Sequence, residues 1–160
     1  MDPTIVPVAQ LYAMDTPLYA KALDGLDREA LLRRPGGQAN GLLWIAGHLA
    51  GARCGLARLL GATVRFPWPR LFVRGAEAPG DDDLPEVAEI RRAWDEGSSA
   101  LLTRLAAVGE AELSAPSSRP YPIEDKSVRG AIVFLAYHEA YHIGQMSLLR
   151  KWLGQPGLVG

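Results

Sequence analysis

The sequence predicts an all-α protein, a four-helix bundle that forms one domain over residues 1–160. Three observations support this prediction. Apolar residues recur at steps of three and four in four long segments, which is the helical period. No segment alternates between apolar and polar residues as a half-buried strand does, and no unit repeats at a fixed period. A chain of 160 residues is also long enough to bury a substantial core.

The composition is that of an ordinary globular protein, with 48% hydrophobic and 22% charged residues. The formal net charge is −1, so the overall charge favours neither nucleic acid nor an anionic membrane as a partner. No run of about 18 uncharged apolar residues predicts a membrane span. Cys54 is the only cysteine, which excludes an intramolecular disulfide, and the N-terminal residues lack the basic region of a signal peptide. We therefore expect a soluble, cytoplasmic protein.

The first helix is expected over residues 8–24, where apolar residues follow helical steps. Pro17 interrupts this pattern. We favour one kinked helix over a shorter helix that begins at the proline with Thr16 as its cap. A short helix over 26–34 follows, capped by Asp27 and ended by a proline and two glycines.

The second long helix is expected over residues 41–60, with Asn40 as its N-cap and Gly61 as its C-cap. Glycine recurs every fourth residue on this helix, at Gly47, Gly51 and Gly55. Each glycine inside a helix costs about 0.5–1 kcal/mol relative to alanine, so a compensating contact is expected. We interpret the glycines as a smooth face on which another helix, of this bundle or of a second subunit, approaches closely.

Residues 62–85 are predicted to form a long connection, since this segment holds four prolines and an acidic triplet. Its aromatic residues are Phe66, Trp68 and Phe72. They argue against full disorder, and we expect them to cover one end of the bundle, at a position that could include the mouth of a pocket.

The third long helix is expected over residues 85–108, with Pro85 in its first position. A second long connection, 109–126, leads to the last helix, 128–153, for which Ser127 is the expected cap. The long connections after the second and third long helices, 62–85 and 109–126, allow a crossover topology. The inward face of the last helix is expected to carry Ala131, Phe134 or Leu135, His138, Tyr141 or His142, Gln145, Leu149 and Trp152.

The three histidines of the chain predict a metal site. His138 and His142 are four residues apart, so on a helix both imidazoles project from one face. His48 lies in the middle of the second long helix, and bundles build metal sites from inward side chains of facing helices. Three neutral imidazoles are a typical catalytic ligand set for zinc, suit nickel as well, and leave a position for water or substrate. The alternative is three separate histidines, each hydrogen-bonded in the core.

Two other interpretations, Cys54 as a metal ligand and a zinc-protease motif, are not supported by the sequence. Cys54 lies six residues after His48, about 240° around the helix, so we expect a small buried hydrophobic residue there. His138-Glu139-x-x-His142 matches the short zinc-protease motif, in which the glutamate is the general base. After Glu139, however, the chain holds no acid or histidine except His142, and Leu148 occupies the place of the third histidine in the extended motif.

Two motifs resemble those of the DinB/YfiT-like superfamily of metal-binding four-helix bundles. The first is NGLLWIAGH at residues 40–48, and the second is SVRG at 127–130 followed by HEAYHIGQ at 138–145. The resemblance covers nearly the whole chain. By this resemblance the metal ligands of the family fall on His48, His138 and His142. The proline inside the first helix and the proline-rich connection 62–85 depart from the pattern and affect the substrate-facing rim.

The resemblance also implies function. Members bind divalent metal, often zinc or nickel, and many form dimers. Their characterised enzymes use mycothiol, bacillithiol or glutathione as S-transferases or isomerases, and DNA binding is not implied. Our leading hypothesis is therefore a homodimeric, thiol-dependent S-transferase that acts on small electrophiles through a metal-bound thiolate. A hydrolase that uses metal-bound hydroxide and a non-catalytic module stapled by metal are the alternatives.

Several residues near the histidines are candidates for roles in such a reaction. Glu139 is a candidate for proton transfer, although we favour a solvated helix charge for it. Gln145 and Tyr141 are candidates to hydrogen-bond a ligand imidazole or a bound water, with core packing as the alternative for Tyr141. Trp44 is expected to pack beside the site. The basic residues that might hold a carboxylate-bearing thiol, or else are simply solvated, are Arg119, Lys126 and Arg129.

Overall fold

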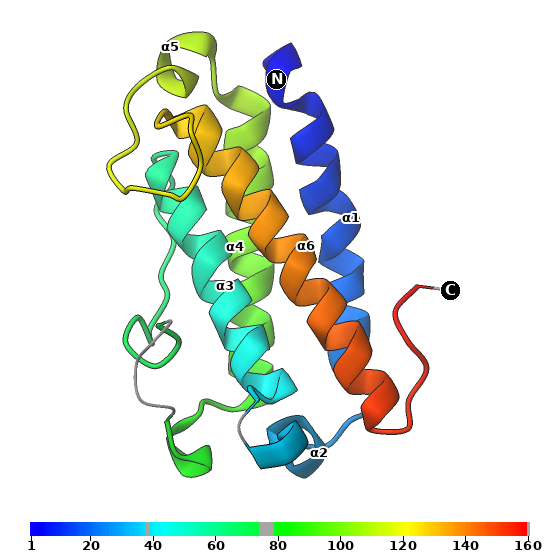
Figure 1. Ribbon diagram of the computed structural model, residues 1–160. Helices are drawn as coiled ribbons and strands as arrows, with labels where there is room; N and C mark the ends of the chain where they lie inside the picture. Colours follow the sequence, from blue (N-terminus) through cyan, green and yellow to red (C-terminus); the bar gives the residue numbers. More distant parts are fainter. Residues whose placement is uncertain (38, 74–78, 160) are drawn as a thin grey trace.

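The computed structural model describes residues 1–37, 39–73 and 79–159, and these form a four-helix bundle (Figure 1). The four long helices are α1 (Val6–Leu23), α3 (Leu42–Leu59), α4 (Val87–Ala107) and α6 (Val128–Trp152). Two short helices, α2 (Arg28–Leu32) and α5 (Glu110–Leu113), lie in the connections. Within the described residues the only β pairing is one bridge between Pro116 and Ser127. The predicted all-α bundle is confirmed.

The long helices are not arranged in the order of the chain. α3 packs against α4 and α6, and α1 also packs against α4 and α6, so that α1 and α3 lie diagonally across the bundle. α3 and α4 run in the same direction, because the connection between them returns along the length of the bundle (Figure 1). This crossover places α3 beside α6. None of the described helices is long and apolar enough to cross a membrane.

The helix boundaries confirm two of the expected caps. Asp27 accepts a hydrogen bond from the backbone N–H of Ala30 at 2.8 Å, and the side chain of Ser127 caps α6. Pro85 precedes the N-cap Glu86 of α4, so its predicted place in the first helical position was wrong. The predictions for α3 were wrong by one residue at each end, since Leu60 and not Gly61 is its C-cap, and Gly41 and not Asn40 is its N-cap. A Cβ at Gly41 would lie 2.9 Å from the carbonyl oxygen of Leu31, so this close approach to α2 requires a glycine.

The buried face of α6 is rotated from the predicted one. It carries Ile132, Ala136, Glu139, Ile143 and Met146, among others. Trp152 is 44% exposed, and His138 and His142 are only partly buried, at the border of this face. Glu139 is 2% exposed, so the expectation of a solvated helix charge was wrong. The sequence pattern of α6 could not show this, because the partner of Glu139 lies on another helix.

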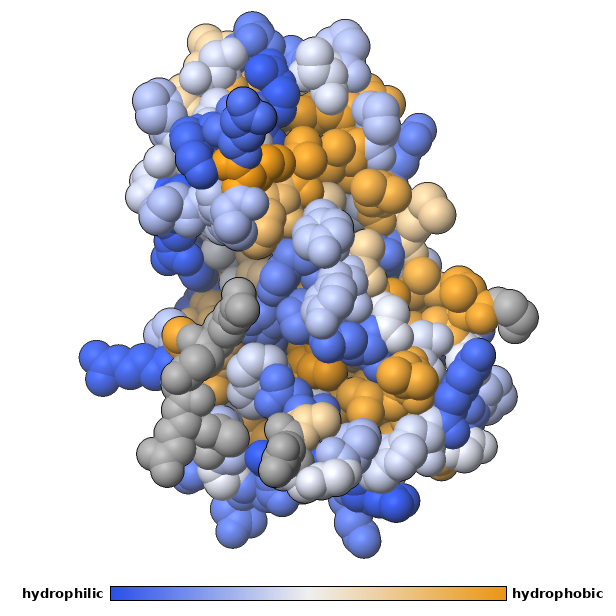
Figure 2. Space-filling model, in the orientation of Figure 1, coloured by the Kyte–Doolittle hydropathy of each residue, from blue (hydrophilic) through white to orange (hydrophobic). Residues whose placement is uncertain are grey.

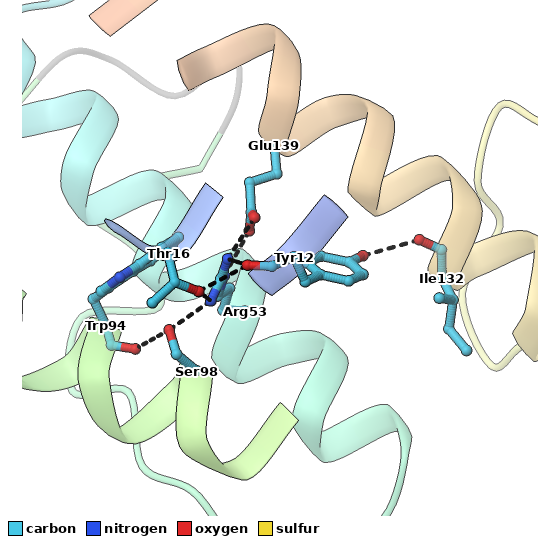
Figure 3. Close-up of polar contacts among 7 residues, drawn as sticks. All are labelled: Tyr12, Thr16, Arg53, Trp94, Ser98, Ile132 and Glu139. Carbon is cyan, nitrogen blue, oxygen red and sulfur yellow. Dashed lines mark hydrogen bonds and ion pairs between the residues drawn. The ribbon is translucent and has the colours of Figure 1, made fainter. Parts of the chain in front are cut away.

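A polar layer divides the core into two apolar clusters. Along α3, Arg53 lies between Leu49 of one cluster and Leu56 of the other. The other long helices each contribute a polar side chain at the same level, and these are Thr16, Ser98 and Glu139. The four helices therefore meet around one buried guanidinium, as Figure 3 shows.

All five N–H donors of Arg53 have acceptors. Nε and Nη2 donate to the two carboxylate oxygens of Glu139, both at 2.7 Å. The remaining donors reach Thr16 Oγ1 at 2.8 Å, Ser98 Oγ at 2.7 Å and the carbonyl oxygen of Tyr12 at 2.8 Å. Burial raises the pKa of Glu139, and the hydrogen bonds and charge of Arg53 oppose that shift.

We expect Glu139→Ala to lower the free energy of unfolding by about 3–5 kcal/mol, because a guanidinium that cannot lose its proton would remain buried without its acid. The double variant Arg53→Met, Glu139→Leu should recover most of this loss, because it replaces the ion pair by apolar side chains of similar volume. Urea denaturation monitored by circular dichroism measures both. A loss below about 1 kcal/mol in Glu139→Ala would contradict a structural role for the ion pair.

Candidate metal centre

The glycine face of α3 is covered by the connection that follows the helix. A Cβ at Gly47 would lie 2.2 Å from the ring of Phe72, and a Cβ at Gly51 would lie 2.9 Å from the ring of Phe66. The predicted helix contact at these glycines was therefore wrong. The two aromatic residues pack along the side of α3, and not over one end of the bundle.

The connection also orients His48. Its Nδ1 lies 2.8 Å from the carbonyl oxygen of Phe72, and because a carbonyl can only accept, Nδ1 carries the proton. Nε2 therefore keeps its lone pair and points toward α6. Trp44, one turn earlier on α3, stacks on the imidazole with ring centroids 5.0 Å apart. Trp44 thus packs beside the site, as expected.

On α6, Gln145 orients His142 in the same way. Gln145 Oε1 lies 2.6 Å from His142 Nδ1, which donates the hydrogen bond and leaves Nε2 with its lone pair. The amide nitrogen of Gln145 donates to Tyr141 Oη at 3.3 Å. The structure therefore brings Gln145 and Tyr141 to the imidazole in a single chain of hydrogen bonds. Tyr141 is 56% exposed, so it is not a core residue.

The three histidines converge between α3 and α6. His48 Nε2 lies 2.9 Å from His138 Nε2, and one ring nitrogen of each of His48, His138 and His142 lies within 4.8 Å of the others. Two imidazole nitrogens on a tetrahedral zinc ion lie about 3.3 Å apart, given bonds of 2.0–2.1 Å. The donor set thus fits a divalent ion after small side-chain shifts.

The electrostatics of the site favour neutral imidazoles. Burial lowers the pKa of both His48 and His142, and the neighbouring His48 lowers that of His142 further. A neutral imidazole is the form that coordinates a metal ion. His48 and His142 therefore need little proton release to act as ligands near neutral pH.

Two cavities adjoin the histidines, and both are lined by His48 and His138. The arginine cavity, about 400 Å³, is lined also by Arg58, Arg119 and several aromatic rings. The tyrosine cavity, about 540 Å³, is lined also by Trp44, Tyr137, Tyr141, His142 and Gln145. His48 and His138 thus adjoin both cavities, whereas His142 adjoins the tyrosine cavity alone.

Most of the remaining charged residues that were candidates from the sequence lie outside the two cavities and bind other parts of the chain. Glu139 lines neither cavity and is held by Arg53. Lys126 donates to the carbonyl oxygens of Tyr121 and Ile123, and Arg129 pairs with Glu110. Of the three basic residues near α6, only Arg119 lines a cavity.

Several residues of the site were missed from the sequence. Phe134 and Pro122 line both cavities, and Arg58 lines the arginine cavity. Arg58 lies seven residues after Gly51 and three after Gly55, so the helical period could have placed it on the same face of α3. The carbonyl of Phe72 had no signal, because a backbone acceptor has no sequence signature.

The fold and the site define a class of protein: a helical bundle in which three histidines from two adjacent helices form a candidate metal centre. A sequence model of the DinB superfamily matches residues 13–146, and the chain belongs to this superfamily. The resemblance seen in the two motifs is thereby confirmed. A comparison with curated proteins found no match.

Proposed function

We propose that the protein binds a divalent metal ion through His48, His138 and His142 and acts as a thiol-dependent S-transferase on small electrophiles. Zinc is the first expectation for the metal and nickel the second. The observation that carries the proposal is the convergence of the three imidazoles, with the Nε2 lone pairs of His48 and His142 made available by hydrogen bonds at Nδ1.

A divalent ion with three imidazole ligands supplies an open coordination position at which the pKa of a thiol falls. The chain itself cannot supply this thiol. Cys54 is its only cysteine, is fully buried, and has a pKa raised by burial to about 11. A small thiol from solution is therefore required, and such thiols are kept reduced in a cytoplasm, which is the compartment that we propose.

The two cavities support a reaction of two substrates. A thiol can enter from the tyrosine cavity and an electrophile from the arginine cavity, so that the two meet at His48 and His138, which both cavities share. In the proposed reaction the thiol loses its proton to the solvent, its sulfur forms a bond to the electrophilic carbon, and the leaving group departs from that carbon with its electron pair. Aromatic side chains line both cavities beside this position.

The proposed ligands predict a graded loss of metal. The reconstituted protein should hold one zinc or nickel ion per chain by elemental analysis, and His48→Ala or His142→Ala should weaken binding by more than about 100-fold. Gln145→Leu should weaken it by about 10–100-fold, because it removes only the acceptor that orients His142. Gln10→Leu, at an exposed glutamine of α1 that lines neither cavity, is the matched control and should keep full metal binding. Full metal retention in His142→Ala would contradict the site.

The proposed activity predicts that conjugate formation requires both metal and thiol. Mycothiol, bacillithiol and glutathione should be tested with the fluorogenic electrophile monochlorobimane, with and without zinc or nickel. We expect turnover with at least one thiol, and loss of turnover after chelation and in His142→Ala. Product formed without thiol would favour a hydrolase instead. No turnover, together with a melting temperature that falls on metal removal, would favour a structural metal.

We also propose that the protein forms a homodimer through α6. Large apolar and aromatic side chains of α6 remain exposed at helical steps, and these are Val133, Tyr137, Tyr141, Leu148 and Trp152. Figure 2 shows apolar side chains at the surface over the C-terminal half of this helix. A second copy would bury this stripe and border the tyrosine cavity, because the stripe and the cavity share Tyr137 and Tyr141.

Leu148→Glu should shift the protein to a monomer in analytical ultracentrifugation, because a charge in the middle of the stripe opposes its burial. Leu11→Glu, at an exposed position on α1, is the matched control and should leave the dimer intact. A monomeric wild-type protein would contradict the proposed dimer.

A further inference from the structure

We propose that the arginine cavity binds an organic carboxylate with an aromatic or branched apolar body, and that Arg58 and Arg119 hold its carboxylate. This inference rests on the proposed function, because it names the class of electrophile that the site accepts. The walls of the cavity, its charge and one glycine of α3 support it.

Two aromatic walls bound the cavity. On one side the rings of Phe66 and Phe72 lie 6.0 Å apart, and on the other the rings of Tyr121 and Phe134 lie 5.5 Å apart. Each wall leads to a histidine: the carbonyl of Phe72 bonds to His48, and the ring of Phe134 lies 6.3 Å from that of His138. An apolar body between these walls would thus present its reactive carbon to the proposed metal position.

The size of the cavity is suitable for a small organic molecule. Its volume is about 400 Å³, within the usual range of about 300–1,000 Å³ for small-molecule sites, which are largely apolar with a few convergent polar groups. In the arginine cavity those polar groups are the two imidazoles, the phenol of Tyr121 and the two guanidinium groups.

The charge of the cavity selects an anion. Its lining includes Arg58 and Arg119 and no acidic residue. Among the described residues neither guanidinium lies within 4.0 Å of a carboxylate, whereas six other arginines pair with an acid. Arg58 donates to the carbonyl of Val64 at 3.3 Å, which leaves most of its donors for a ligand. The planar guanidinium matches a carboxylate with two parallel hydrogen bonds.

Gly55 keeps space in this cavity. A Cβ at Gly55 would meet no atom within 4 Å, unlike one at Gly47 or Gly51, so no packing contact explains a glycine in the middle of α3. Gly55 lines the cavity, one turn before Arg58 on the same face of the helix. A larger side chain would stand in the space that a ligand needs.

The test measures binding of 4-phenylbutyrate and of its neutral isostere 4-phenylbutanamide to the zinc-loaded protein by isothermal titration calorimetry, without thiol. We expect the carboxylate to bind at least about tenfold more tightly than the amide at low salt. The double variant Arg58→Met, Arg119→Met should abolish this preference. Arg70→Met, an exposed arginine outside the cavity lining, is the control and should retain it.

A second pair of variants separates an effect on ligand binding in the cavity from an effect on the stability of the fold. Gly55→Leu should bind neither compound and should melt at a higher temperature than the wild type, because leucine favours the helix. Gly144→Leu, on α6, is the matched control: it too has no atom within 4 Å of an added Cβ, but it lines neither cavity, and it should retain binding.

Equal affinities for the two compounds, or unchanged binding to a folded Gly55→Leu protein, would overturn the proposal. If this happens while metal binding and thiol conjugation persist, the class of electrophile is wrong and the proposed function stands. If the carboxylate preference is found but no thiol is conjugated, the cavity is assigned correctly and the proposed transferase activity is wrong.

Discussion

The buried guanidinium of Arg53 is the constraint on which the arrangement of the four helices depends. It takes a hydrogen-bond acceptor from every other long helix, so any change of register would leave a buried charge without partners. The same register sets the candidate metal centre. Glu139 directly follows His138 on α6, and Arg53 lies on α3 five residues after His48. A slip of one turn, about 5.4 Å, would break the ion pair and separate the two imidazoles together.

The connection after α3 contributes as much to the site as the helices do. Because α3 and α4 are parallel, the chain must return along the whole bundle, and this return lies over the glycine face of α3 (Figure 1). Two consequences follow. The carbonyl of Phe72 fixes the tautomer of His48, and the rings of Phe66 and Phe72 form a wall of the arginine cavity. A segment that interrupts the helical pattern thereby determines which ring nitrogen of His48 is available at the candidate metal centre.

The elements that were predictable from the sequence are those that depend on local chemistry. The period of apolar residues located the long helices, and the side chains of Asp27 and Ser127 marked two helix starts correctly. The pair His138 and His142 was recognisable because four residues make about one helical turn. Where a local rule competed with a tertiary contact, the local rule was wrong: Asn40 is a good cap by its side chain, but the approach of α2 selects Gly41.

The sequence alone determined the helical class, the superfamily motifs and the three histidines, because spacing along a helix specifies which side chains share a face. Only the tertiary structure decided which of those faces points into the core. It placed Glu139 in the core and the histidines at its border, because a guanidinium from α3 offsets the cost of burying a carboxylate. It also decided that aromatic rings, and not a helix, cover Gly47 and Gly51 of α3. Such pairings join residues that are distant in sequence, and no local pattern encodes them.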